Sequence, residues 1–314
     1  MKTLHAFALA ATLVGGSASA APATMPEPLV PIANPFHNVR DLLACTARDG
    51  TLVSAHRGGA GPGYPENAIE TGAHTLSQFP ALLEVDVRRS RDGVLLLMHD
   101  ATLERTSTGS GPVDAQDWAA LQKLHLKDND GQETSFRIPR LIEMARWAKG
   151  RALVLAEVKI SDSLPQIIRE IREAGAQANI MLLVNSIDDA KRAQALDPDI
   201  ALTFDISSPA ALEEAKAAGV DTKRIIAWTG IGKRDRAFWA DLRGRGMVVA
   251  YGTLWYVDGA IENLDLKGLY AELARDGVDL MATDRAAVAH AEISAVRPIE
   301  PALQRCRASG APAR

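Results

Sequence analysis

The sequence has little cysteine, no excess of positive charge, and no long apolar run beyond its first residues. Two cysteines among 314 residues leave it without a soft ligand set for zinc. The formal net charge of −4 gives no reason to expect a nucleic-acid partner. No stretch after the first 20 residues reaches the length that spans a bilayer, so we expect no stable membrane insertion. Nothing in the sequence implies a protein partner.

The first 20 residues have the pattern of a secretory signal peptide. Lys2 gives a positive start, residues 4–16 are mostly apolar, and Ala18-Ser19-Ala20 is a small-x-small cleavage site. We therefore expect an exported protein, periplasmic or secreted, that is cleaved near Ala20. The segment that follows is rich in proline and alanine, and we expect an N-terminal arm over residues 21–50.

Cys45 and Cys306 form an even pair in a chain that we expect to be exported. Such a pair favours a disulfide, here one that joins the two ends of the domain. Two free thiols and an intermolecular bond are the alternatives. The sequence does not decide among them, because it does not give the distance between the two side chains.

Strand-like runs alternate with helix-like segments along the chain. We count nine strand candidates, at residues 52–55, 82–89, 94–98, 152–158, 180–184, 200–204, 224–228, 247–251 and 278–282. Asp92-Gly93 is typical of a two-residue hairpin turn, so the run at 94–98 must be antiparallel to the run before it. The other eight match the parallel strands of an α/β fold, the (β/α)8 TIM barrel. A doubly wound open sheet is the alternative, but no G-x-G-x-x-G follows the first strand.

We expect this barrel to occupy residues 51–295 and to be followed by a C-terminal tail over residues 296–314. The β-hairpin and a small polar insertion, at about residues 101–137, come after the second strand. The insertion contains Asp128-Asn129-Asp130-Gly131, which we interpret as a turn because it lacks the alternating ligand spacing of a calcium-binding EF-hand loop.

Two carboxylates lie in the apolar run at 82–89. Glu84 and Asp86 are two residues apart, so in a strand both project from the same face and repel each other, which a hard divalent cation relieves. If Asp92-Gly93 is a type I′ turn, Asp86 lies directly across from His99 on that face. The alternative is a surface hairpin with a solvated acidic edge.

Further polar residues follow other strands of the predicted barrel, where the carboxyl ends of parallel strands gather catalytic groups. His56 and Arg57 end the first strand, Glu157 and Lys159 end the run at 152–158, and Thr283-Asp284 ends the last. Structural ion pairs are the alternative interpretation of such residues.

Together these side chains suit phosphoryl chemistry. Glu84, Asp86 and Glu157 form an all-oxygen set for one divalent cation, Mg²⁺ or Ca²⁺. Arg57 and Lys159 add positive charge that favours an anionic substrate, most naturally a phosphate. His56 and His99 would then act as general acid and general base, although the sequence does not say which is which.

Several motifs, in this order, resemble the glycerophosphodiester phosphodiesterases. They are His56-Arg57-Gly58, Pro65-Glu66-Asn67, Glu84-x-Asp86, Asp92-Gly93, His99-Asp100 with Leu103 and Arg105-Thr106, Ile138-Pro139-x-Leu141 with Glu143, Glu157-x-Lys159 and Thr283-Asp284.

The resemblance covers residues 52–286 and implies a TIM-type catalytic barrel. It implies one divalent metal on the three carboxylates, catalytic His56 and His99, and phosphate contacts from Arg57 and Lys159. Glu66, Asn67 and Asp100 lie within the motifs and are candidates for supporting those residues. The implied reaction releases glycerol 3-phosphate and an alcohol from a glycerophosphodiester, a small-molecule substrate.

The chain departs from the family at one strand. The family usually carries Trp-Thr-Val-Asn on its penultimate strand, whereas this chain has Ala250-Tyr251-Gly252-Thr253 there and a Trp228-Thr229 pair one strand earlier. Because this strand shapes the pocket, the head group is left open, as are the native metal and the nucleophile (water or a neighbouring hydroxyl).

Two other functions are alternatives. A phospholipase of sphingomyelinase D type, acting on lipid phosphodiesters, would share the barrel and the metal site but would need an apolar mouth that faces a membrane. An exported phosphodiester-binding protein without catalysis would have two similar lobes and would leave His56 and His99 unexplained.

Overall fold

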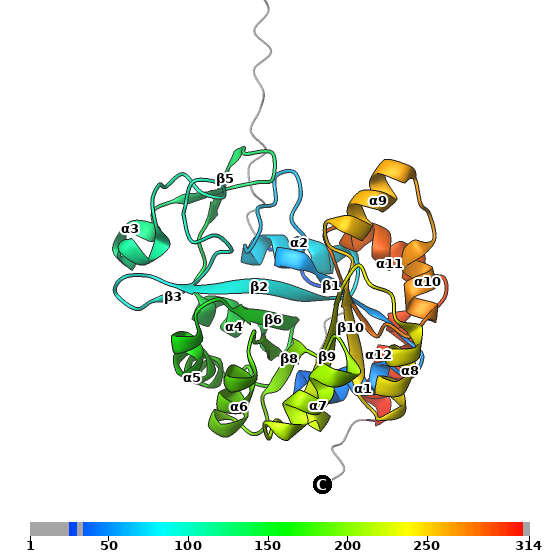
Figure 1. Cartoon of the computed structure of the whole chain (residues 1–314). Coiled ribbons are helices and arrows are strands. Elements are labelled where there is room, and N and C mark those ends of the chain that lie inside the picture. The colour runs from blue at the N-terminus through cyan, green and yellow to red at the C-terminus, as the bar shows by residue number, and fades with distance from the viewer. Residues whose placement is uncertain (1–24, 30–33, 310–314) are drawn as a thin grey trace, which may run out of the picture.

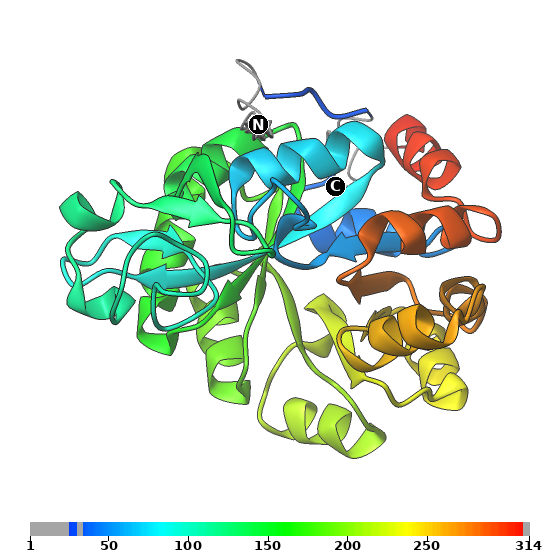
Figure 2. The ribbon, with the colours of Figure 1, turned by 90° about the horizontal axis from the view of Figure 1, so that it is seen from above.

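The computed structural model describes residues 25–29 and 34–309, so the predicted signal peptide lies outside the described residues. Eight parallel strands form a closed barrel, which confirms the TIM-barrel prediction (Figures 1 and 2). In barrel order the strands are β1 (Leu52–Ala55), β2 (Ala81–Arg89), β6 (Leu153–Val158), β7 (Ile180–Leu183), β8 (Ala201–Asp205), β9 (Ile225–Ile231), β10 (Val248–Gly252) and β11 (Leu280–Thr283). β1 pairs with both β11 and β2 and so closes the barrel.

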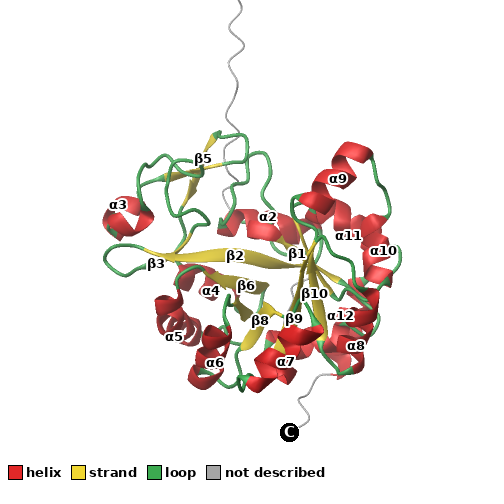
Figure 3. Cartoon of the chain, viewed as in Figure 1, coloured by secondary structure: helices red, strands yellow, loops and turns green. Residues whose placement is uncertain are grey.

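Helices surround the strands, as the secondary-structure colouring shows (Figure 3). They are α2 (Ile69–Gln78), α4 (Leu141–Ala148), α5 (Leu164–Ala174), α6 (Ile187–Leu196), α7 (Pro209–Ala217), α8 (Arg236–Gly244), α9 (Tyr256–Leu264), α10 (Leu269–Arg275) and α11 (Ala286–Ser294). Short 3-10 turns occur at His56–Gly58, Val113–Ala115, Ser161–Ser163 and Thr222–Arg224.

Apolar stripes and, in some helices, capping residues account for the positions of the helices. In α5, Leu164, Ile167, Ile168 and Ile171 recur at helical spacing, and all four are buried against the barrel. Ser186 caps α6 by accepting the Asp189 backbone N–H. Among the described residues, no helix has the length and apolar character needed to cross a bilayer.

β3 (Leu95–Leu97) pairs with β2 in the antiparallel direction that the sequence predicts, but the register differs by one residue. Val87 pairs with Leu97, and the Met98 backbone N–H donates to the Asp86 carbonyl oxygen. Asp86 therefore lies opposite Met98, and our prediction that it lies opposite His99 is wrong.

The cause is a three-residue loop in place of the predicted type I′ turn. Ser90 and Val94 close the hairpin, and Gly93 alone in the loop has a positive φ, +88°. Asp92 is held by two donors, the Ser90 hydroxyl at 2.6 Å and the Trp118 backbone N–H at 2.9 Å. Because Trp118 belongs to the insertion, the local sequence of the hairpin did not reveal the loop.

The insertion forms a small unit above β2 and β3 (Figure 1). It contains α3 (Trp118–Leu121) and a two-stranded antiparallel sheet of β4 (His125–Lys127) and β5 (Glu133–Arg137). Its buried side chains, which include Leu121 and Phe136, pack with Leu96 and Met98 of the hairpin. A turn follows Asp128, whose side chain accepts backbone N–H groups.

Two helices that the sequence did not predict close the other end of the barrel. α1 (Val39–Thr46) and α12 (Ile299–Ser309) lie in the segments that we expected to be an arm and a tail. Buried side chains of both helices pack with the inward-facing side chains of the barrel strands. A disulfide joins Cys45 to Cys306, with the two Cα atoms 6.0 Å apart.

Candidate active site

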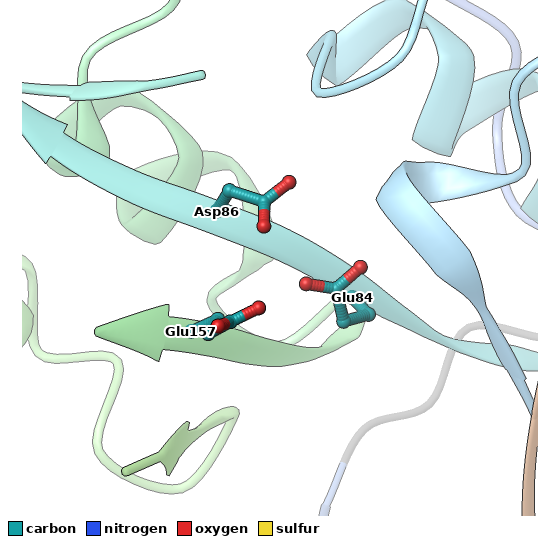
Figure 4. Close-up of side chains that lie close together, drawn as sticks. All are labelled: Glu84, Asp86 and Glu157. Atoms are coloured by element: carbon teal, nitrogen blue, oxygen red, sulfur yellow. The ribbon is translucent and has the colours of Figure 1, made fainter. Parts of the chain in front are cut away.

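Three carboxylates meet at the carboxyl ends of two neighbouring strands. Glu84 and Asp86 lie on β2, and Glu157 lies on β6, where it is the register partner of Asp86. Each residue offers one oxygen, and these three oxygens lie within 4.8 Å of one another (Figure 4). Three carboxylate oxygens this close together can bind one cation.

Glu84 is the most constrained of the three carboxylates. Its Oε2 accepts the Arg57 backbone N–H at 2.7 Å, while its Oε1 is buried without a hydrogen-bond partner. Burial, together with the charge of Asp86, raises the pKa of Glu84 to about 8. A buried carboxylate oxygen that lacks a donor and a pKa raised in this way are both relieved by a bound cation, so the residues fit one.

Asp86 is held by an asparagine and a lysine. The Asn67 side-chain amide donates to Oδ2 at 2.8 Å, and the Asp86 backbone N–H donates back to Asn67 Oδ1 at 2.8 Å. Lys159 Nζ lies 2.9 Å from Asp86 Oδ1 and 2.7 Å from Glu157 Oε2. Burial alone would raise the pKa of Asp86, but Lys159 and Asn67 hold it below its ordinary value.

His56 follows β1 directly and is oriented by a carboxylate. Its Nδ1 lies 2.6 Å from Asp284 Oδ1, so Nδ1–H donates to the carboxylate and Nε2 remains available. Nε2 lies 3.9 Å from Glu84 Oε2. Burial lowers the pKa of His56, but the hydrogen bond to Asp284 and the charge of Glu84 outweigh it, so the pKa is raised.

Our sequence reasoning listed Asp284 as a strand-end residue but did not pair it with His56. The signal was present in the predicted topology. A closed barrel makes the first and last strands neighbours, and Ala55 pairs with Thr283, so the next residues, His56 and Asp284, lie side by side.

Asp258, in the first turn of α9, fixes the end of β11. One of its oxygens accepts the Asp284 backbone N–H at 2.7 Å, and its carboxylate also accepts the Thr283 hydroxyl and the Tyr270 hydroxyl. The residue is buried. It positions the backbone that presents Asp284 to His56, and sequence reasoning missed it.

His99 has a similar carboxylate partner. Its Nδ1 lies 2.7 Å from Asp100 Oδ1, so Nε2 is again the free nitrogen. His99 lines the same cavity as Glu84 and Glu157.

Arg105 links the supporting residues. Its guanidinium donates to both oxygens of Asp100 and to both oxygens of Glu66, at 2.6–2.9 Å. The hydrogen bonds from Arg105 are the largest cause of the pKa of Asp100 lying well below its usual range. Arg105 belongs to a matching motif, but its role was not foreseen from the sequence.

Arg57 turns back toward the carboxylates. Its backbone is in the left-handed region, with φ +51°. Its Nη1 donates to Glu66 at 3.0 Å, and its buried Nε lies 3.9 Å from Asp86 Oδ2 without a hydrogen-bond partner. A positive group held beside the carboxylates in this way is suited to an anionic ligand.

Glu84 and Glu157 open into a cavity of about 540 Å³ at the end of the barrel, whereas Asp86 is buried beside them. His56, His99 and Lys159 line it with Glu84 and Glu157. The structure thus brings together the predicted catalytic and metal-binding residues from four separate stretches of the chain.

A family model described as the glycerophosphoryl diester phosphodiesterase family matches residues 56–227 of the chain. The crystal structure of a glycerophosphoryl diester phosphodiesterase from Parabacteroides distasonis is 32% identical, with a TM-score of 0.76. The match covers 84% of this chain and 94% of that one.

Two more distant proteins are similar over different lengths. A glycerophosphodiester phosphodiesterase from Bacillus altitudinis is 29% identical over 127 residues, which are 39% of this chain and about half, 51%, of that protein. A phosphodiesterase from Oleispira antarctica, solved with the product sn-glycerol-3-phosphate, is 24% identical, with a TM-score of 0.59 and coverage of 78% and 97%. At that identity the likeness concerns the fold alone.

Proposed function

Since the chain belongs to the glycerophosphoryl diester phosphodiesterase family, we propose that it hydrolyses glycerophosphodiesters to glycerol 3-phosphate and an alcohol. One observation carries the proposal. Two imidazoles, His56 and His99, each donate Nδ1–H to a carboxylate, and both line the cavity that Glu84 and Glu157 also line.

We propose that the reaction depends on one divalent cation. The donor set of Glu84, Asp86 and Glu157 contains only oxygen and suits Mg²⁺ or Ca²⁺, and the buried Oε1 of Glu84 has no hydrogen-bond partner among the described residues. When bound there, a divalent cation supplies positive charge that stabilises the phosphoryl oxygens. Arg57 and Lys159 add to that charge from the protein side and orient the phosphate.

The two histidines then move the protons. As the oxygen of water forms its bond to phosphorus, one Nε2 accepts its proton. Attack by the neighbouring glycerol hydroxyl would instead form a cyclic phosphate, which water would open in a second step to give glycerol 3-phosphate. As the ester P–O bond to the alcohol breaks, the other Nε2 donates a proton to the leaving oxygen. Asp284 and Asp100 hold the two rings in the tautomer that this requires.

The direct test is the release of glycerol 3-phosphate by histidine variants. His56→Ala and His99→Ala should each lower kcat roughly 10²- to 10⁴-fold while leaving the circular dichroism spectrum unchanged. His37→Ala, an exposed histidine beside α1, is the matched control and should keep its activity. Turnover close to that of the wild type in either active-site variant would contradict the assignment.

Exposed apolar side chains around α9 favour a second candidate, hydrolysis of lipid phosphodiesters. Trp255, Leu264 and Leu266 are 63%, 68% and 42% exposed, and Trp255 lines the cavity. Release of the head group from lysophosphatidylcholine, at a rate above that from glycerophosphocholine, would favour this candidate. A two-lobed binding protein has no support, because the described residues form one barrel.

We also propose that the protein acts after export, in the periplasm or outside the cell. The Cys45–Cys306 disulfide supports this location, because such bonds persist in oxidising compartments. Protease protection of the protein in intact cells, followed by its release on selective opening of an outer membrane, would test the location.

A further inference from the structure

The half of the cavity that faces the carboxylates is built from β8 and β9. In the closed barrel, β9 lies four strands from β2 in either direction, so its residues lie across the barrel from Glu84. Trp228 on β9 lines the cavity together with Asp205 at the end of β8. The two are register partners on neighbouring strands, so their side chains share the face that looks into the barrel mouth.

A glycine makes room for the indole of Trp228. A Cβ atom at Gly252, on the neighbouring strand β10, would lie 2.7 Å from Cη2 and 3.1 Å from Cζ2 of Trp228. The first distance is shorter than Cβ atoms tolerate and the second is tight, so any other residue at position 252 would displace the ring. The aromatic wall of the cavity therefore depends on Gly252.

A second indole stands at the mouth of the same cavity. Trp255 follows β10, lines the cavity and is 63% exposed. Its backbone has φ +55°, an unusual conformation for a bulky residue, and this backbone holds the ring at the mouth rather than in the core.

Asp205 gives this half of the cavity a negative charge. Among the lining residues it is the one charged side chain outside the group formed by the catalytic histidines, the carboxylates and Lys159. Its Oδ1 accepts the Ser207 backbone N–H at 3.0 Å, and within the described ranges it forms no ion pair. A carboxylate that forms no ion pair among the described residues, in a cavity lined by two indole rings, favours a positively charged ligand.

We propose that Asp205, Trp228 and Trp255 form a subsite for an ammonium group on the alcohol half of the substrate, as in choline or ethanolamine esters. The inference rests on the proposed function, because a phosphodiester held at the carboxylates and Arg57 has one ester arm that extends across the cavity. The carboxylate attracts the ammonium group, and the indole faces bind it by cation–π contact.

The first test compares two substrates of similar size. Wild-type protein should show a kcat/KM for glycerophosphocholine about ten-fold above that for glycerophosphoglycerol. Asp205→Asn should lower this ratio about ten-fold. Asp199→Asn is the matched control, because Asp199 precedes the same strand at the opposite end of the barrel and is 75% exposed. It should leave both the activity and the ratio unchanged.

Tryptophan variants separate an aromatic contact from simple filling of space. Trp228→Phe should keep most of the preference for the choline ester, and Trp228→Leu should lose it.

The same comparison is repeated with lipid substrates, lysophosphatidylcholine and lysophosphatidylglycerol. A preference that depends on Asp205 in either pair supports the subsite, and the pair that shows it identifies the source of the head group. A ratio near one that Asp205→Asn leaves unchanged in both pairs overturns it.

A binding experiment keeps the subsite testable even without hydrolysis. Calorimetric titration with choline chloride should show binding that Asp205→Asn weakens about ten-fold and Asp199→Asn does not. If no glycerophosphodiester is hydrolysed but choline binds in this way, the proposed function is wrong and the subsite stands. If hydrolysis occurs but choline binding is absent or does not depend on Asp205, the subsite is wrong and the proposed function stands.

Discussion

Replacing Glu84 by glutamine should stabilise the metal-free protein while abolishing its activity. Glu84 is buried, its Oε1 has no hydrogen-bond partner, and burial raises its pKa to about 8. The folded protein therefore binds this proton more tightly than the unfolded chain does. The stability that protonated Glu84 contributes is fully present below its unfolded pKa and is lost as the pH rises through about 8.

The size of the effect follows from the pKa. A difference of about 3.5 between the folded and unfolded values corresponds to about 5 kcal/mol, an upper limit because the surroundings relax around the charge. Glutamine keeps the shape of the side chain and an oxygen for the Arg57 backbone N–H, but it does not ionise. Without metal, Glu84→Gln should exceed the wild type in free energy of unfolding by on the order of 3–5 kcal/mol at pH 9, and by little at pH 4.5.

Urea unfolding in EDTA, followed by tryptophan fluorescence at several pH values, measures this difference. Glu214→Gln, an exposed carboxylate on α7, is the matched control and should show no such dependence on pH. Adding a divalent cation should raise the stability of the wild type and leave that of Glu84→Gln nearly unchanged. A stability difference between Glu84→Gln and the wild type that stays constant from pH 4.5 to pH 9 would refute the reasoning.

Three further predictions concern residues that support the site or the fold. Asp284→Asn removes the charge that raises the pKa of His56. The limb of the kcat/KM pH profile that His56 governs should therefore move to lower pH, and kcat should fall roughly ten-fold or more. An unmoved limb would count against the pairing of Asp284 with His56. Asn67→Gly can still adopt the positive φ of this position, but it removes the amide that donates to Asp86. In a metal titration of activity, the Kd for the activating cation should rise about 10- to 100-fold. An unchanged Kd would show that Asn67 does not support the site. Replacing Cys45 and Cys306 by serine should lower the free energy of unfolding, measured by urea unfolding, by about 2–5 kcal/mol. The kcat at 25 °C should not change. Equal stability would mean that the disulfide does not constrain the unfolded chain.

The sequence predicts the barrel well because its strands are nearly continuous apolar runs bounded by helices. It also predicts the carboxylate group, since Glu84 and Asp86 follow the two-residue repeat of a strand and Glu157 ends a neighbouring strand. A charged side chain inside a buried strand costs free energy unless it is paired or binds a ligand. Such residues therefore stand out as functional candidates even when the partner strand is unknown.

The features that the sequence did not predict depend on contacts between distant residues. The hairpin loop is fixed by Trp118 of the insertion, 26 residues from Asp92, and the local Asp-Gly pattern favours a different turn. The partner of His56 is 228 residues away, at the end of the last strand. Arg105 joins Asp100 to Glu66 through side chains alone.

The helices that close the barrel were missed for another reason. α1 follows a segment rich in proline and alanine, and it is only eight residues long. Val39, Leu42, Leu43 and Thr46 are nevertheless buried at helical spacing, which was the available signal. A short amphipathic helix of this kind gains its stability from packing, here against the open end of the barrel.

The most direct test of the account is the release of glycerol 3-phosphate from glycerophosphocholine before and after removal of divalent cations. The account predicts that EDTA abolishes release and that Mg²⁺ or Ca²⁺ restores it in the wild type but not in Glu84→Gln. Full release in the continued presence of EDTA, or no release by folded protein with either cation, would contradict the account.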